Sequence, residues 1–287
     1  MDQQLYGGVE IGGTKVICAV GDDQGTISRR ATFKTAGVEA TMQAIGAFFA
    51  ANKTVRAVGV GSFGPLQLNP RAADFGHIYH SPKAGWEQVN LKGLLEAQLQ
   101  LPISLETDVN CAALGELHFG VARRVENFIY LTVGTGIGGA LVRDGKIVHG
   151  VRNLEMGHVR IPHEVLANGY SGSCPFHGDC LEGLASGLAL HQRYAQAAEA
   201  ITDRSIWDQE ATYLALAIHN LMLTNGPELV VIGGGVADHE GLLPAIRTKV
   251  AALVNDYLVF PDLDDYIVAA SGPTNGVLGA LQLAVAS

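Results

Sequence analysis

Residues 5–21 of the chain read LYGGVEIGGTKVICAVG, two apolar runs joined by a turn at Gly12 to Lys15. Each run has the length and the β-branched content of a strand, and glycines are typical of the tight turn between antiparallel strands. A third run, TISRRATF (26–33), follows a second turn at Asp22 to Gly25. The beginning of the chain is therefore predicted to be a three-stranded meander.

This pattern returns further along the chain. FIYLTVGTGIGG (128–139) leads into ALVRDG (140–145) and KIVHG (146–150), with Asp144–Gly145 as a hairpin turn. Two more pairs match in the same order: residues 57–65 resemble 229–237, and residues 102–117 resemble 265–284. Segments with helical spacing, such as 41–52 and 213–225, lie between them. We therefore expect an α/β protein built from two related halves, with a ligand cleft between two lobes.

Composition excludes several classes of protein. The chain has 287 residues, of which 48% are hydrophobic and 16% charged, which argues against disorder and coiled coils. A net charge of −9 without a basic run argues against a nucleic-acid partner. Four cysteines make no disulfide framework, and neither a leader segment nor a membrane span is recognisable. We expect a compact, water-soluble protein of the reducing cytoplasm.

The second glycine turn, Gly134 to Gly139, satisfies the dinucleotide fingerprint G-x-G-x-x-G. That fingerprint must open a helix, whereas another β-hairpin follows here, so a dehydrogenase is disfavoured. Between two strands, such glycines can form a turn whose backbone N–H groups face an anion. Gly12 to Lys15 offers the same arrangement with an added hydroxyl and ammonium. The two turns are interpreted as phosphate-binding turns, with ordinary hairpin turns as the alternative.

Two cysteines and two histidines occur in the order H-x15-C-x2-H-x2-C, at His158, Cys174, His177 and Cys180. Two thiolates and two imidazoles suit tetrahedral zinc, and the short spacings let one loop surround a single ion. Because four ligands leave no open position, the zinc is expected to be structural. His163 is an alternative to His158 as the fourth ligand.

Three carboxylates are candidates for chemistry. Asp108 follows a predicted strand and precedes a predicted helix, at the end of a strand where α/β sheets bind ligands. The alternative for Asp108 is helix capping, a role that Thr107 also suits. Glu155 and Glu182 flank the predicted zinc loop and could accept hydrogen bonds from vicinal sugar hydroxyls, or could be ordinary solvated side chains.

These motifs and their order resemble the ROK family of sugar kinases and sugar-responsive repressors, whose fold is that of actin and hexokinase. The resemblance covers nearly the whole chain. Within the family, CPFHGDCLEGLASG (174–187) is most similar to bacterial zinc-containing fructokinases. The other matching segments are YGGVEIGGTK (6–15), ETDVNCAALGE (106–116), LTVGTGIGGALV (131–142), EMGH (155–158) and LVVIGGGVA (229–237).

The resemblance implies a duplicated, ribonuclease H-like fold with a small lobe at 1–117, onto which residues 276–287 pack, and a larger lobe at 118–275. It implies ATP and Mg²⁺ as cofactors, a structural Zn²⁺, a hexose substrate, most simply fructose, and a homodimer. Asp108 would be the catalytic base. Glu155, His158, Glu182 and Gly64 would contact the sugar, with His158 also on zinc. The phosphate contacts would be Gly12, Gly13, Thr14, Lys15, Thr135 and Gly136, with Pro227, Gly234 and Gly235 near adenosine.

Three positions depart from the family pattern. Glu10 stands where many members have Asp, which lengthens the reach toward a Mg²⁺-bound water. GSFGPL (61–66) differs from the more usual Gly-x-Pro-Gly loop beside the sugar, and Thr107 replaces an Asn that could contact a sugar hydroxyl.

Two alternatives remain open. Glucose, mannose and N-acetylmannosamine are further possible substrates, because one hydroxyl decides among them. A sugar-sensing repressor is disfavoured, since no DNA-binding segment is expected ahead of Tyr6.

Overall fold

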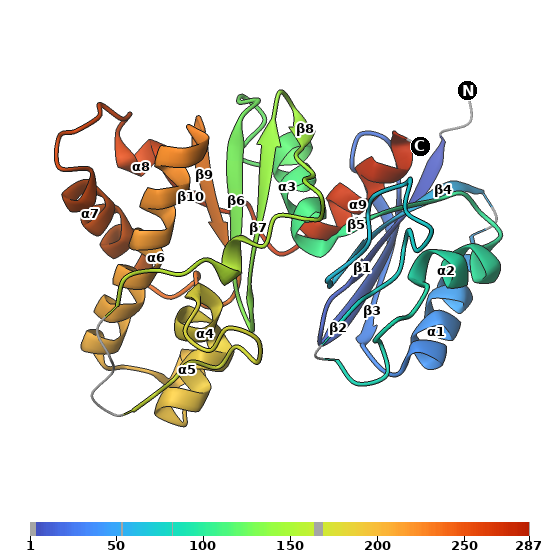
Figure 1. Cartoon of the computed structure of the whole chain (residues 1–287). Coiled ribbons are helices and arrows are strands. Elements are labelled where there is room, and N and C mark those ends of the chain that lie inside the picture. The colour runs from blue at the N-terminus through green and yellow to red at the C-terminus, as the bar shows by residue number, and fades with distance from the viewer. Residues whose placement is uncertain (1–3, 53, 82, 164–168, 287) are drawn as a thin grey trace. The chain divides into compact units, whose positions relative to one another are not determined.

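The computed structural model describes residues 4–52, 54–81, 83–163 and 169–286. The chain divides into two compact units (Figure 1). Unit 1 comprises Met1–Arg124, Lys146–Leu154 and Ser271–Ser287, and unit 2 comprises Val125–Gly145 and Glu155–Ala270. Among the described helices, none has the length and apolar character needed to cross a membrane.

Unit 1 is built on a five-stranded mixed sheet with the strand order β3-β2-β1-β4-β5. The predicted meander forms its antiparallel half, and β4 and β5 run parallel to β1. The strands are β1 (Leu5–Ile11), β2 (Lys15–Gly21), β3 (Ile27–Lys34), β4 (Val55–Ser62) and β5 (Ile103–Thr107).

Helices cover both faces of this sheet. On one face, α1 (Val38–Ala50) and α2 (Leu91–Leu99) supply apolar residues such as Ile45, Phe48 and Leu95 to the main core. On the other face, Val277 and Leu281 of α9 (Asn275–Val285) pack on Ile17 and Ala19. Helix α3 (Asp108–Phe119) packs closely along α9. The end of the chain is thereby part of unit 1.

The second sheet has the strand order β10-β9-β6-β7-β8. Its antiparallel pair β6–β7 and the parallel strands β9 and β10 repeat the arrangement of the first sheet, with β6 in the place of β1. The strands are β6 (Phe128–Val133), β7 (Ile137–Arg143), β8 (Lys146–Ile147), β9 (Leu229–Gly233) and β10 (Ile267–Ala269). The predicted duplicated α/β fold is confirmed.

One predicted strand is much shorter than expected. Residues 146–150 were assigned to a third strand, yet only Lys146 and Ile147 form β8, whereas β3 has eight residues. Beyond them His149 pairs with the Glu106 carboxylate, and both residues belong to unit 1, so this stretch leaves the second sheet. The hairpin turn before β8 is as predicted, with positive φ at Asp144 and Gly145.

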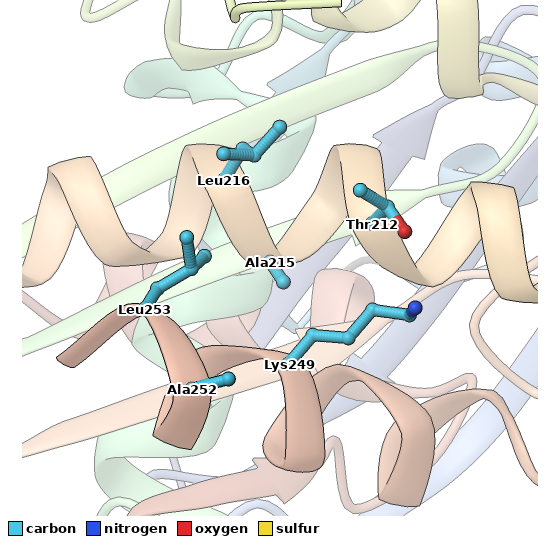
Figure 2. Close-up of a pocket in the computed structure, with 6 residues that line it drawn as sticks. All are labelled: Thr212, Ala215, Leu216, Lys249, Ala252 and Leu253. Atoms are coloured by element: carbon cyan, nitrogen blue, oxygen red, sulfur yellow. The ribbon is translucent and has the colours of Figure 1, made fainter. Parts of the chain in front are cut away.

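The remaining helices belong to unit 2. Helices α6 and α7 pack side by side, and between them lies a groove of about 250 Å³ that Figure 2 shows. Small and apolar side chains line most of it, and none of its lining residues is a predicted site residue. The helices are η1 (Met156–His158), α4 (Leu181–Ala185), α5 (Gly187–Tyr194), η2 (Ala198–Ala200), α6 (Arg204–Asn225), α7 (Leu242–Val254) and α8 (Leu263–Tyr266).

Candidate active site and metal cluster

The predicted residues of unit 1 gather at one edge of its sheet. Strands β1, β4 and β5 are parallel neighbours, and their last residues Ile11, Ser62 and Thr107 lie in register. The residues that follow these strands therefore emerge side by side, among them Gly12, Gly64 and Asp108. Two contacts show how closely these segments lie. The Phe63 N–H donates to Ile11 O at 2.9 Å, and a Cβ on Gly61 would lie 3.3 Å from the Asp108 Cα.

The capping alternative for Asp108 is answered by its neighbour. Thr107 is the N-cap of α3, and its hydroxyl oxygen accepts the Asn110 N–H at 3.1 Å. Asp108 occupies the first turn and is half-buried, and its Oδ1 accepts the Val109 N–H at 2.9 Å. A carboxylate at a helix N-terminus is stabilised in its charged form by the helix dipole. Asp108 is thus a carboxylate at a strand-to-helix junction that leaves the N-cap role to Thr107.

Glu10 is the second carboxyl group of this edge. Its Oε2 is buried and has no hydrogen-bond partner among the described residues. The first turn of α9 lies against it, since a Cβ on Gly276 would come within 2.6 Å of Oε2. Burial raises the pKa of Glu10 to about 7, and the negative charge of Asp108 adds to the rise. Two nearby carboxyl groups, one with an unpartnered oxygen, are oxygen donors suited to a hard cation such as Mg²⁺.

The first glycine turn is closed by a hydrogen bond from Gly12 N–H to Lys15 O at 2.9 Å. Gly13, Thr14 and Lys15 are exposed. Within the described part of the chain, the N–H groups of Gly13 and Thr14 have no protein acceptor. Backbone amides in this state can bind an anion, as the sequence predicted for this turn.

The second glycine turn belongs to unit 2, and backbone hydrogen bonds fix its conformation. Gly134 N–H donates to Gly136 O at 2.9 Å, while the carbonyls of Gly134 and Thr135 accept from Gly187 and Leu188 of α5. Glu182 lies against the same turn, where its Oε2 accepts the Ile137 N–H at 2.9 Å. Glu182 was predicted as a sugar contact, and this hydrogen bond adds a role in holding the glycine turn.

Glu155, His158 and Glu182 lie close enough to influence one another's charge. Crowding by neighbouring atoms desolvates the Glu155 carboxyl and raises its pKa, although the side chain keeps one exposed side. His158 opposes this rise and Glu182 adds to it. The three predicted sugar-contacting residues of unit 2 therefore form one polar cluster, next to the predicted zinc ligands.

The four predicted metal ligands converge. One ligand atom each from His158, Cys174, His177 and Cys180 lies within 4.8 Å of the others. Cys174 Sγ lies 3.7 Å from His158 Nδ1 and 3.6 Å from His177 Nδ1, and Cys180 Sγ lies 3.5 Å from His158 Nδ1. Tetrahedral zinc with ordinary bond lengths would set such S···N separations at about 3.6 Å. The residues therefore fit a zinc ion in kind and in spacing.

His163, the alternative fourth ligand, has a different partner. Its Nε2 lies 3.1 Å from Asp179 Oδ2, and Asp179 also forms an ion pair with Arg160. Arg160 in turn donates to the carbonyl of His177 at 3.0 Å. His163 thus belongs to a polar group beside the cluster, and of the two candidates for the fourth ligand His158 is the one that lies within it.

The predicted adenosine-side residues are not all together. Gly234 has φ 98°, and a Cβ there would overlap the Val133 carbonyl, so only glycine lets this loop dock on β6. Gly235 is exposed, with open space around it. Pro227 lies before β9, whereas the two glycines follow it. A five-residue strand spans about 16 Å, so the two ends of β9 lie that far apart. Pro227 is buried, and its carbonyl accepts the Tyr266 hydroxyl at 2.8 Å. The structure thus separates Pro227 from Gly234 and Gly235.

Three polar residues near the unit 1 edge carried no signal in the sequence. His149 pairs with Glu106, and both Thr35 and Lys83 hydrogen-bond to carbonyls of the first glycine turn. Each contact joins segments far apart in the chain, and none of the three residues lies in a recognisable motif. Only the folded chain reveals them.

Comparison with known proteins adds the family. The ROK family model matches residues 6–287. Fructokinase from Pediococcus pentosaceus is 39% identical over 99% of this chain and 98% of its own length. Fructokinase from Streptococcus mutans is 39% identical over 98% and 97%. A ROK family glucokinase from Streptomyces griseus, solved with glucose and AMPPNP, superposes with a TM-score of 0.80 at 27% identity, covering 99% of this chain and all of that one. The chain belongs to the ROK family.

Proposed function

We propose that this protein is an ATP-dependent fructokinase that forms fructose 6-phosphate. The observation that carries the proposal is the convergence of Asp108, Glu10 and the first glycine turn at one sheet edge, in a chain about 39% identical to fructokinases over its full length. In phosphoryl transfer, positioning and charge stabilisation do most of the work. A base, an anion-binding turn and a cation-binding carboxyl are the groups that such a reaction requires.

Asp108 would orient the primary hydroxyl of the sugar and accept its proton as the oxygen bonds to the γ-phosphorus, while the bond from that phosphorus to the bridging oxygen breaks and ADP leaves. The hydrogen bond from the Val109 N–H at the start of α3 holds the direction of the Asp108 side chain. The N–H groups of Gly13 and Thr14 would hold phosphate oxygens. Glu155, His158 and Glu182 would bind sugar hydroxyls as hydrogen-bond partners.

Mg²⁺ is the cation that kinases of this type use, and when bound it neutralises charge on the phosphates. Glu10 is the residue that fits it, because its Oε2 is buried without a partner among the described residues and a nearby cation would compensate its charge and that of Asp108. The extra methylene of Glu10, compared with the Asp of many family members, places this oxygen further from the backbone.

Structural zinc is the second metal that we propose. His158, Cys174, His177 and Cys180 would fill all four positions of a tetrahedral ion, which leaves none for water. The ion would fix the loop that joins Glu155 to Glu182. Its proposed role is to hold these two carboxylates in place.

The test is a coupled ADP-release assay on the purified protein with fructose, glucose, mannose and N-acetylmannosamine. We expect the highest kcat/KM with fructose. Preference for another hexose would change the substrate but keep the class, whereas no sugar-dependent ADP release would contradict the kinase. Light scattering on the same sample tests the proposed homodimer. The proposed location is the cytoplasm, which fits four cysteines that are all free thiols in the structure.

A further inference from the structure

The first glycine turn is held by hydrogen bonds to three consecutive carbonyls. Gly12 O accepts the Thr35 hydroxyl at 2.7 Å, and Gly13 O accepts Lys83 Nζ at 2.7 Å. Thr14 O accepts the Thr35 N–H at 3.0 Å. Thr35 is only 4% exposed, so two of these three contacts come from a residue fixed inside unit 1.

These contacts fix which way the N–H groups point. The C=O and N–H of one trans peptide point in opposite directions. Because Gly12 O and Gly13 O are bound by Thr35 and Lys83, the N–H groups of Gly13 and Thr14 point away from these donors. Those are the two amides that have no protein acceptor in the described part of the chain.

Packing does not fix this orientation. Apart from its chain neighbours, no described residue has an atom within 4 Å of the position that a Cβ on Gly13 would occupy, and Gly12 has the Lys15 carbonyl oxygen nearby. Glycine adopts positive and negative φ with similar ease, so either peptide could turn over at little steric cost. A turned peptide would present a carbonyl oxygen to the phosphate. The hydrogen bonds to Thr35 and Lys83 are what oppose that.

Lys83 is positioned by a turn that hydrogen bonds stabilise. Its N–H donates to Ser81 Oγ at 3.1 Å, and its carbonyl accepts the Trp86 N–H at 3.1 Å. Trp86 is fully buried, with its Nε1 bonded to Ala36 O at 3.1 Å and its ring edge-on to Phe63. Since Ala36 follows Thr35 directly, both groups that hold the glycine turn rest on the same part of unit 1.

We propose that Lys83 and Thr35 are positioning residues that lock the peptide planes of Gly12 to Thr14, so that the Gly13 and Thr14 N–H groups face the phosphates of ATP. The charge on Lys83 also polarises the Gly13–Thr14 peptide and strengthens its N–H as a donor. This inference rests on the proposed function, in which the turn binds phosphate. Neither residue touches the phosphate in this arrangement.

Calorimetric titration with ATP, inorganic tripolyphosphate, adenosine and fructose tests the lock. Lys83→Met should weaken binding of ATP and tripolyphosphate about tenfold, the order expected for losing a hydrogen bond to a charged group. Lys83→Arg should restore most of it. Adenosine and fructose should bind as before. The matched control is Lys146→Met, which removes the same charge from an exposed site on β8.

Substitutions at Thr35 distinguish the effect of peptide orientation on phosphate binding from the effect of the Lys83 charge. Thr35→Val removes the bond to Gly12 O without changing any charge and should also weaken tripolyphosphate binding, whereas Thr35→Ser should not. The melting temperature of each variant without ligand shows whether it is folded. Unchanged tripolyphosphate affinity in folded Lys83→Met would overturn the inference, as would equal losses in Lys83→Met and Lys146→Met. If losses extend to adenosine and fructose, the contacts brace unit 1 generally and the lock is wrong.

The wild-type protein tests the proposed function separately. Failure of the wild type to bind both ATP and tripolyphosphate would remove the phosphate turn itself, and with it both proposals. A wild type that binds them and variants that bind equally well would remove the lock alone.

Discussion

His149 Nε2 lies 2.6 Å from Glu106 Oε1, although 43 residues separate the two in the chain. Glu106 is buried on β5, two positions before Asp108, and its other oxygen accepts the Asn110 side-chain amide at 2.8 Å. One carboxylate therefore ties the segment 146–154 to the first turn of α3. Segment 146–154 continues directly into Glu155. The Glu106–His149 pair therefore anchors the stretch that precedes Glu155, at a position on β5 close to Asp108.

The pair predicts a pH-dependent stability. The hydrogen bond to Glu106 raises the pKa of His149 above its ordinary value, so protonated His149 is favoured in the folded state. This stabilisation is fully present below about pH 6.5, the unfolded value, and is lost as pH rises through the folded pKa. Because His149 is half-exposed, its size should be about 1 kcal/mol or less. His149→Gln should flatten this part of the profile in urea denaturation between pH 5.5 and 8.5.

The control for this experiment is His80→Gln. His80 pairs with Glu87 at 2.9 Å, but both side chains are largely exposed, so the pair should contribute little. A His149→Gln profile that parallels both the wild type and His80→Gln would show that the Glu106 contact does not persist in solution.

Asp108→Asn should lower kcat at least about a hundredfold, the range expected for loss of a general base, with a much smaller change in the Kd for fructose. Steady-state ADP release and calorimetry measure the two quantities. The matched control is Asp203→Asn at the N-cap of α6, which should leave turnover unchanged and stability nearly so, because Asn caps a helix about as well as Asp. Near-wild-type turnover in Asp108→Asn would exclude Asp108 as the base.

The metal cluster predicts a difference between two histidines. His158→Ala should lose zinc, because its imidazole lies within the cluster. His163→Ala should keep about one zinc per chain, because it pairs with Asp179 instead, and four ligands complete the ion's coordination. Metal analysis after gel filtration measures both. The reverse result would make His163 the ligand.

Chelation tests the purpose of the zinc. If the ion holds the loop between Glu155 and Glu182, its removal should abolish activity even when Mg²⁺ is in excess. Readdition of zinc should restore turnover. Full activity in a sample shown by metal analysis to be zinc-free would contradict the structural role.

The sequence predicted those features of the fold and the site that depend on residues close together in the chain. Apolar runs and glycine turns identified both meanders, and the strand-to-helix junction at Asp108 was recognisable because strand, cap and helix are contiguous. Close spacing likewise predicted Cys174, His177 and Cys180 as a group. The role of Pro227 near adenosine stays a prediction, although β9 separates this residue from Gly234 and Gly235. Lys83 and His149 could not be found, since side chains that meet across long loops leave no periodic signal.

Gly279 lies where α9 packs closely against α3. A Cβ on Gly279 would overlap the Cys111 carbonyl and would lie 2.8 Å from Gly115 N, both in the backbone of α3. In an exposed helix, Gly→Ala stabilises by about 1 kcal/mol. Here the backbone cannot yield as a flexible side chain would, so we expect Gly279→Ala to lose about 3 kcal/mol or more instead.

Urea denaturation measures this change, and Gly37→Ala is the control. Gly37 precedes α1 at φ −60°, with no atom near its Cβ position, so alanine there should cost less than about 1 kcal/mol. A stabilised Gly279→Ala would mean that α3 and α9 lie further apart than the structure places them. Gly276 of α9 lies against Glu10 and Asp108 begins α3, so a shift of α9 away from α3 would disturb the packing around the Glu10 carboxyl. A destabilised but folded variant should therefore lose kcat as well as stability.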